Sequence, residues 1–192
     1  MTDWAPAVPT PEQQLTAFPI CEDSEFADVA VVGAKSTDPL QLERFEVANV
    51  SLQDCDVIGV VIRGGRVSRL LVEQSRLRSA VWMDGTLQDL TFDGVTAADV
   101  SFRFSTLRRA VFRNCTLSRL DLTEVTIDRV RFERCDLSGA RFDGAKATSL
   151  RIEECDLTGC TGAEALRGGS VDPRDLISLA PSLAVALGIK IE

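Results

Sequence analysis

The sequence predicts an all-β solenoid that is closed by a helix at its C-terminal end. From Leu42 to Leu157, every fifth residue is Leu, Ile, Val, Phe, Trp or Ala, which gives 24 apolar positions in register. The residue two positions before each of them is apolar in 20 of the 24 cases. The other three columns hold nine apolar residues among 72 positions.

A period of five fits neither of the two common secondary structures. Apolar residues recur every 3.6 positions in an amphipathic helix and every two positions in a half-buried strand. The pattern fits a coil that turns a corner every five residues, with two side chains directed inward and three outward. Repeats of fixed period indicate a solenoid. Asp, Asn, Gly, Ser and Arg are frequent among the outward residues after each central one, as turns require.

The repeating units themselves identify a family resemblance. Cys135-Asp-Leu-Ser-Gly139, Ala140-Arg-Phe-Asp-Gly144 and Cys155-Asp-Leu-Thr-Gly159 are clear examples. They resemble the pentapeptide-repeat family, whose consensus is a small residue, a polar one, Leu or Phe, and two further polar residues. The resemblance implies a right-handed quadrilateral β-helix with four pentads in each coil, about six to seven coils in all, and a C-terminal α-helical cap.

Three segments follow from this pattern. Residues 1–23 contain four prolines and no period, and we expect an extended N-terminal tail. Residues 24–160 form the β-helix, which is irregular at 34–39 and regular at 40–160. One extra residue must lie in the irregular stretch, because the pentad centres Val31 and Leu42 are eleven residues apart. Residues 161–192 are expected to form the C-terminal capping or dimerisation helix.

The C-terminal segment carries helix signals. Asp172 and Pro173 suit the N-cap and the first helical position, so we expect the helix to begin there. Pro181 predicts a kink or two short helices, and Gly188 predicts the helix end. The apolar stripe either caps the last coil or forms a dimer surface, or does both. The candidate dimerisation residues are Leu176, Leu183 and Leu187.

Composition excludes several kinds of site. The chain has no histidine, so histidine-based catalysis and metal binding are excluded. Cys115, Cys135 and Cys155 are 20 residues apart in one inward column. We expect them to stack as buried, reduced side chains, because a linear row does not offer the closed geometry of a thiolate metal site. Cys21 lies outside the repeats and should react first with a thiol reagent. No cofactor is expected.

Charge and segment composition suggest where the protein works. The net charge is −8, of which residues 1–39 carry −6 and the regular repeats carry −1. The chain has neither the basic start and apolar core of a signal peptide nor a long apolar membrane segment. We therefore expect a cytoplasmic protein with no membrane partner and no direct contact with nucleic acid.

Two surface features are candidates for binding a partner. The face centred on Val67, Leu87, Leu107 and Ile127 is basic, and it either meets an acidic partner or is simply solvated. Its candidate residues are Arg66, Arg69, Arg108, Arg109 and Arg129. The second feature is an outward apolar cluster on the face of Trp82, which either marks an interface or is covered by the N-terminal tail. Its residues are Val61, Val81, Met83 and Phe104.

These features favour a non-enzymatic protein-binding scaffold whose partner is unknown. The resemblance also implies an alternative, because some family members mimic DNA and bind or protect DNA gyrase. That role requires uncompensated acidic columns, and here opposite charges alternate between coils, as at Asp89 and Arg109. An enzyme is disfavoured because a regular solenoid lacks a concave pocket. The resemblance further implies a homodimer joined through the C-terminal end.

Overall fold

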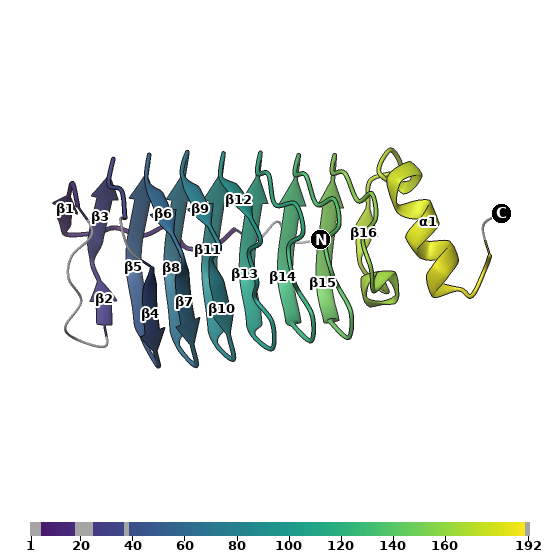
Figure 1. The fold of residues 1–192 in the computed structure, drawn as a ribbon, viewed down its shortest axis with the longest axis horizontal. Coiled ribbons are helices and arrows are strands. Elements are labelled where there is room, and N and C mark those ends of the chain that lie inside the picture. The colour runs from purple at the N-terminus through teal and green to yellow at the C-terminus, as the bar shows by residue number, and fades with distance from the viewer. Residues whose placement is uncertain (1–4, 18–24, 37–38, 191–192) are drawn as a thin grey trace.

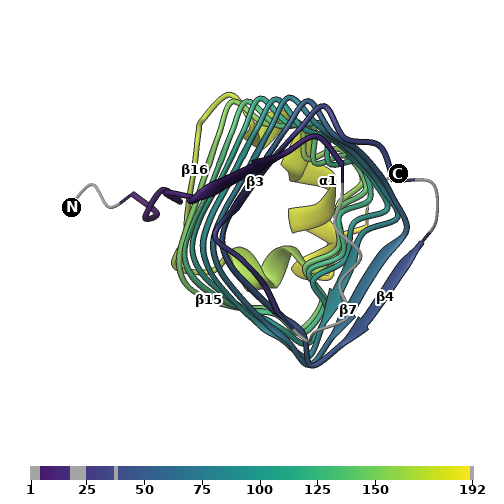
Figure 2. The same cartoon turned by 90° about the vertical axis from the view of Figure 1, so that its left-hand side faces the viewer.

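The computed structural model describes residues 5–17, 25–36 and 39–190. They form a β-solenoid of about seven turns with one C-terminal α-helix. Figure 1 shows the coils stacked side by side along the long axis, with the helix at one end. Seen from the other end, the coils share a four-cornered outline (Figure 2). The fold class predicted by the five-residue period is confirmed.

The strands gather into three parallel sheets. The largest follows two neighbouring faces of the solenoid, and its strands are β1 (Gln13–Leu15), β2 (Glu25–Ala27), β3 (Val29–Val32), β5 (Glu46–Gln53), β8 (Arg66–Glu73), β11 (Thr86–Asp93), β13 (Thr106–Arg113), β14 (Thr126–Glu133), β15 (Lys146–Glu153) and β16 (Ser170–Val171). The second contains β4 (Leu40–Glu43), β7 (Val60–Arg63) and β10 (Val81–Met83). The third contains β6 (Asp56–Ile58), β9 (Arg76–Arg78) and β12 (Thr96–Ala98).

The register between coils follows the sequence period. Leu87 pairs with Leu107, so that one coil takes 20 residues and four pentads. In the first coil the offset is 21, because Lys35 pairs with Asp56. It returns to 20 where Leu40 pairs with Val60. The extra residue therefore lies between Lys35 and Leu40, within the stretch that was predicted to be irregular.

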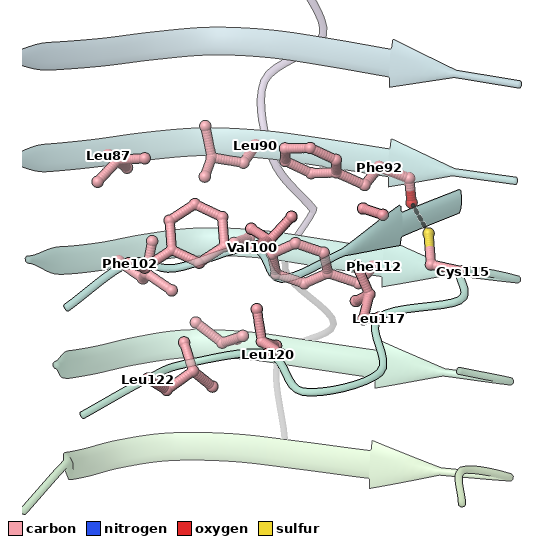
Figure 3. Packing of buried hydrophobic residues seen from close by; sticks show 14 of the residues in the cluster. Leu87, Leu90, Phe92, Val100, Phe102, Phe112, Cys115, Leu117, Leu120 and Leu122 are labelled. Atoms are coloured by element: carbon pink, nitrogen blue, oxygen red, sulfur yellow. Dashed lines mark hydrogen bonds between the residues drawn. The ribbon is translucent and has the colours of Figure 1, made fainter. Parts of the chain in front are cut away.

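The two inward columns form one continuous core. From Val47 to Leu157, every central residue is buried except Leu52 and Ala147, which are half-buried. Rings stack between coils, with Phe112 centred 5.0 Å from Phe92 and 4.8 Å from Phe132. Figure 3 shows Phe92 and Phe112 stacked among other buried apolar side chains of successive coils. The inward assignment made from the sequence is confirmed.

The corners have a common backbone conformation. From Arg44 to Gly159, the second residue after each centre has a positive φ, and Ser149 is the exception. Ser149 lies beside the register shift between β14 and β15. Only some of these corner residues are glycine, so many corners hold Asp, Asn or Arg in the left-handed region, which normally costs about 1–2 kcal/mol per residue.

The C-terminal cap differs in detail from the prediction. After the 3-10 helix η1 (Ala163–Leu166), helix α1 spans Leu176–Ala186, so Pro173 is not its first residue. The N-cap position is Asp175, whose carboxylate is buried and accepts the Cys155 N–H at 3.0 Å. Asp172 instead accepts the N–H of Arg174. The expected start was wrong because Asp172 closes a turn and Asp175 caps the exposed backbone of the last coil.

Helix α1 is not divided at Pro181. The proline lies inside one uninterrupted helix, and the expectation of two helices was wrong. Leu179 is buried against the last coil and Leu183 packs against the same core, which holds the helix in place on both sides of the proline. Gly188, with φ at 72°, follows the helix end as predicted. Among the described residues, no helix has the length and apolar character needed to cross a bilayer.

Part of the predicted N-terminal tail is a strand. β1 pairs in parallel with β3 and so covers the edge of the first coil. Because an open sheet edge exposes unpaired N–H and C=O groups, this strand closes the N-terminal end of the solenoid as helix α1 closes the other. Cys21 lies outside the described residues.

Candidate interaction surfaces

The apolar cluster predicted on the Trp82 face comes from outward positions of three successive coils. We call Val61, Val81, Met83 and Phe104 the apolar patch. Val61 and Val81 are paired neighbours on β7 and β10. Their side chains and that of Met83 are half-buried, whereas Phe104 is 47% exposed at a corner. The guanidinium of Arg103 lies 5.1 Å from the centre of the Phe104 ring.

The described part of the N-terminal tail lies elsewhere. Its backbone bonds to Asn49 and Asp89, which lie at a corner of the large sheet. Figure 2 shows this segment on the side of β15 and β16, whereas β4 and β7 lie on the opposite side. Residues 5–17 therefore leave the apolar patch uncovered, and the alternative in which the tail covers the patch finds no support in this segment.

The predicted basic face loses much of its charge to ion pairs. Arg109 forms two hydrogen bonds with the Asp89 carboxylate, each 2.6 Å long. Arg129 and Arg108 both reach Asp128, at 3.0 and 3.4 Å. The hydrogen bond from Arg129, followed by that from Arg108, lowers the pKa of the Asp128 carboxyl. Arg66 and Arg69, the other two predicted residues, form no ion pair among the described residues and carry the remaining charge.

The face centred on Phe92, Phe112 and Phe132 also carries ion pairs. Glu133 accepts Arg113 from the preceding coil at 2.9 Å and Arg131 from its own strand at 3.1 Å. Burial opposes ionisation of Glu133, but these two arginines outweigh it and lower its pKa. Other pairs cross coils at the remaining corners, and examples are Arg78–Asp56, Arg119–Asp99 and Arg174–Glu154. The predicted charge compensation between coils is therefore present as direct contacts.

The C-terminal end exposes two of the three predicted residues and, in addition, two that were not predicted. Leu176 is 44% exposed and Leu187 is 75% exposed, so both can contact another molecule. Leu183 is only half-exposed, because it packs on the core of the same chain. Ile177 and Val185 are 85% and 73% exposed. In the sequence, Ile177 and Val185 lie off the main apolar face of the predicted helix, and for this reason they are exposed.

The cysteine ladder, which we define as Cys115, Cys135 and Cys155, is buried in one column. The Cys135 N–H lies 3.4 Å from the Cys155 sulfur, and the Cys115 sulfur lies 3.5 Å from the Phe92 carbonyl (Figure 3). The neighbouring Cys115 thiol and burial together raise the pKa of Cys135 to about 12. The described residues contain no group of metal-ligating side chains that could hold an ion. The ladder is thus part of the core.

The fold and these surfaces define a class of protein: a four-sided β-solenoid whose functional groups all lie on its outside. A family model described as pentapeptide repeats (8 copies) matches residues 98–134 and 127–161. The match spans residues 98–161, so this part of the solenoid is similar to the pentapeptide-repeat family. No curated protein matches the sequence.

Several solved structures are similar to the chain at low identity. A trypsin-treated variant of QnrB1, a plasmid-mediated fluoroquinolone resistance protein, is 12% identical with a TM-score of 0.47, and the match covers 97% of this chain and 98% of that one. Full-length QnrB1 is 18% identical with a TM-score of 0.36, over 86% and 100% of the two chains. HetL, a pentapeptide-repeat protein involved in heterocyst differentiation in the cyanobacterium Nostoc, is 12% identical with a TM-score of 0.22, over 76% and 86%.

Proposed function

We propose that this protein is a non-enzymatic protein-binding scaffold, and that the apolar patch is its contact surface. The observation that carries the proposal is the exposure of Phe104 at a corner of the coil that follows Val81 and Met83, on a rod that pairs several of its charges across coils, as at Arg109–Asp89 and Arg113–Glu133. Contiguous apolar surface on a soluble protein marks interaction sites, and aromatic residues dominate the energetics of interfaces.

Capture experiments with a corner substitution test this role. Phe104 has a φ of 59°, so Phe104→Asn removes the ring and keeps a residue that tolerates the left-handed region. Asp84→Asn is the matched control, because Asp84 occupies the same corner one coil earlier with a φ of 55°. The full chain and the Asp84→Asn variant should retain the same protein from the native cytoplasm, and Phe104→Asn should lose it. Equal retention by all three would refute the patch as the contact surface.

Mimicry of DNA, with gyrase as the target, is the weaker proposal. A mimic must reproduce dense negative charge, and the network around Glu133 instead alternates acids with arginines in adjacent coils. Addition of the full chain to a gyrase supercoiling assay should therefore leave the rate unchanged. Inhibition of supercoiling, or protection of gyrase from a quinolone, would favour mimicry over the scaffold proposal.

We also propose that two copies pair through the C-terminal end. Ile177, in helix α1, and Leu187, at its C-cap, expose apolar surface on the element that already covers the last coil, and isologous pairing is the commonest way to bury such a surface. Light scattering should give the mass of a dimer for the full chain and of a monomer for Ile177→Asp combined with Leu187→Asp. Val8→Asp, which changes an apolar residue that is 64% exposed near the other terminus, is the control and should leave the dimer intact. A monomeric full chain at tens of micromolar would refute the pairing.

A further inference from the structure

The N-terminal segment lies on the solenoid with a three-residue period. Pro6 and Pro9 are buried, whereas Ala5, Ala7, Val8 and Thr10 are exposed. This is the period of a polyproline II helix, which has three residues per turn and no internal hydrogen bonds. Both prolines therefore point toward the rod, and the residues between them point away from it.

The backbone of this segment bonds to two side chains of the rod. The Ala7 N–H donates to the Asp89 carboxylate at 3.2 Å. The Thr10 N–H donates to the Asn49 side-chain carbonyl at 2.7 Å, and the Asn49 amide donates back to the Thr10 carbonyl at 3.0 Å. The residue that follows each buried proline is thus the one whose N–H is bound. Proline itself has no N–H to leave unsatisfied.

The spacing of these contacts agrees with the geometry of both partners. Asn49 and Asp89 occupy the same corner two coils apart, because Asn49 precedes Arg69 and Asp89 by steps of 20 residues. Two coils span about 9.6 Å at a strand separation of about 4.8 Å. Three residues of polyproline II, from Ala7 to Thr10, span about 9.3 Å. One turn of the extended segment therefore matches two coils of the solenoid.

The floor beside this corner is apolar on its outer side. Leu71, Thr91 and Val111 are register neighbours on β8, β11 and β13, and all three are directed outward. Val111 is nevertheless only 2% exposed and does not belong to the core cluster. We call the strip of surface that is formed by this column and the Asn49–Asp89 corner, where Ala7 and Thr10 are bound, the corner groove. In Figure 1 the purple N-terminal trace passes behind the strands of these coils.

The acceptors of the corner groove are held by the rod itself. Asp89 is 5% exposed and is fixed by the two hydrogen bonds from Arg109. Asn49 is 6% exposed, and its amide also donates to the Asp28 carboxylate. Both residues have a φ of 57°, so their side chains leave the backbone from equivalent corner positions in the same direction. A groove whose acceptors are pre-positioned loses little entropy when an extended segment binds.

We propose that the corner groove is a binding site for a Pro-x-x-Pro segment of a partner protein, and that residues 5–12 of this chain occupy it in cis and must be displaced. Recognition rests on two buried prolines and on the N–H that follows each of them, so any extended segment with this spacing can satisfy it. Preformed, low-entropy polyproline II segments are a recurrent mode of peptide recognition. The groove is separate from the apolar patch, so this proposal does not depend on the patch.

The test uses the full chain and a labelled peptide with the sequence of residues 5–12. The double substitution Pro6→Ala and Pro9→Ala weakens the cis occupant without touching the rod. When the cis segment occupies the site in most molecules, the apparent affinity for the peptide falls in proportion to the fraction of molecules whose site is free. Fluorescence anisotropy should therefore show about ten-fold tighter binding of the peptide to the double variant than to the unaltered chain. A peptide of the same composition with its prolines adjacent should not bind to either protein.

A groove substitution completes the test. Asn49→Gly keeps a residue suited to positive φ and removes both hydrogen bonds to the backbone of Thr10. In the double variant it should weaken peptide binding at least ten-fold. Asn114→Gly, at another corner with a φ of 51°, is the matched control and should leave binding unchanged. Absence of saturable binding to the double variant, or equal binding to the Asn49→Gly protein, would overturn the proposal. A concentration-dependent dimer of the unaltered chain that disappears in the double variant would also overturn it, because the occupant would then be a second copy.

Discussion

A charge placed at a central position should unfold the solenoid. Leu137 is fully buried, so Leu137→Asp removes a packed side chain and leaves a carboxylate with no partner. Loss of the leucine side chain costs about 2–5 kcal/mol. An uncompensated buried charge costs about 3–5 kcal/mol more. The sum reaches the 5–15 kcal/mol by which typical domains are stable, so we expect the variant to be unfolded or aggregated at about 25 °C.

Two matched variants separate the causes of this loss. Leu137→Asn introduces a side chain of similar size without the charge, and should remain folded with a stability lower by about 3–6 kcal/mol. Ser138→Asp places the same carboxylate one residue further on, at an outward position, and should change stability by less than about 0.5 kcal/mol. Urea denaturation followed by circular dichroism measures all three. Similar midpoints for Leu137→Asp and Ser138→Asp would refute the inward and outward assignment.

Three further predictions concern the corners, the thiols and the charges. Gly159 and Gly162 both have a φ of 70°. A Cβ added at Gly159 has free space, whereas a Cβ added at Gly162 would lie 2.4 Å from the backbone N of Asp143. In urea denaturation, Gly159→Ala should therefore cost about 1–2 kcal/mol of stability and Gly162→Ala clearly more, and equal losses would contradict the close approach. The cysteine ladder should resist a thiol reagent in the native state and react after denaturation, because all three thiols are buried in the core; at Cys135 the pKa, raised to about 12, further disfavours the reactive thiolate. Rapid native labelling would contradict the burial of the ladder. Burial opposes ionisation of Asp89, but hydrogen bonds led by that of Arg109 lower the pKa of its carboxyl. The contribution of Asp89 to folding stability is therefore complete above the pKa of an unfolded aspartate, about 4, and is lost as the pH falls below that value. Asp89→Asn should thus reduce stability at pH 7, and the stability difference from the unaltered chain should shrink in acid.

The period predicts the core because it describes the environment of each side chain directly. Two of every five positions face inward in all coils, so residues as far apart as Val47 and Leu157 obey one rule. The extra residue before Leu40 could be placed from the sequence for the same reason, since it shifts the register of every later pentad. The left-handed corners were less visible, because Arg69 and Asp89 adopt a conformation for which glycine is the usual signal.

The helix boundary shows where local signals mislead. Asp172 followed by Pro173 has the composition of a helix start, but the last coil still has unpaired backbone N–H groups at its open edge. Asp175 supplies an acceptor for one of them at Cys155, and burial raises the pKa of this carboxyl. The cap therefore begins where it satisfies the coil below, and that requirement is not contained in the helix sequence.

The corner groove could not be predicted from the repeats because its two components lie far apart in the chain. Prolines without a period of five indicate only an extended segment, and an Asn or Asp at a corner indicates only a turn. The match between the prolines and the corner residues becomes clear when two lengths are compared. One turn of polyproline II rises about 9.3 Å, and two coils of the solenoid span about 9.6 Å. A β-solenoid repeats the same corner at every coil, so residues outside the repeat decide where along the rod a segment binds. Arg69 and Arg109 flank Asp89 in its column and offer no acceptor for a backbone N–H. Asn49 and Asp89 accept the two N–H groups, and this fixes the register of the Pro-x-x-Pro segment on an otherwise repetitive surface.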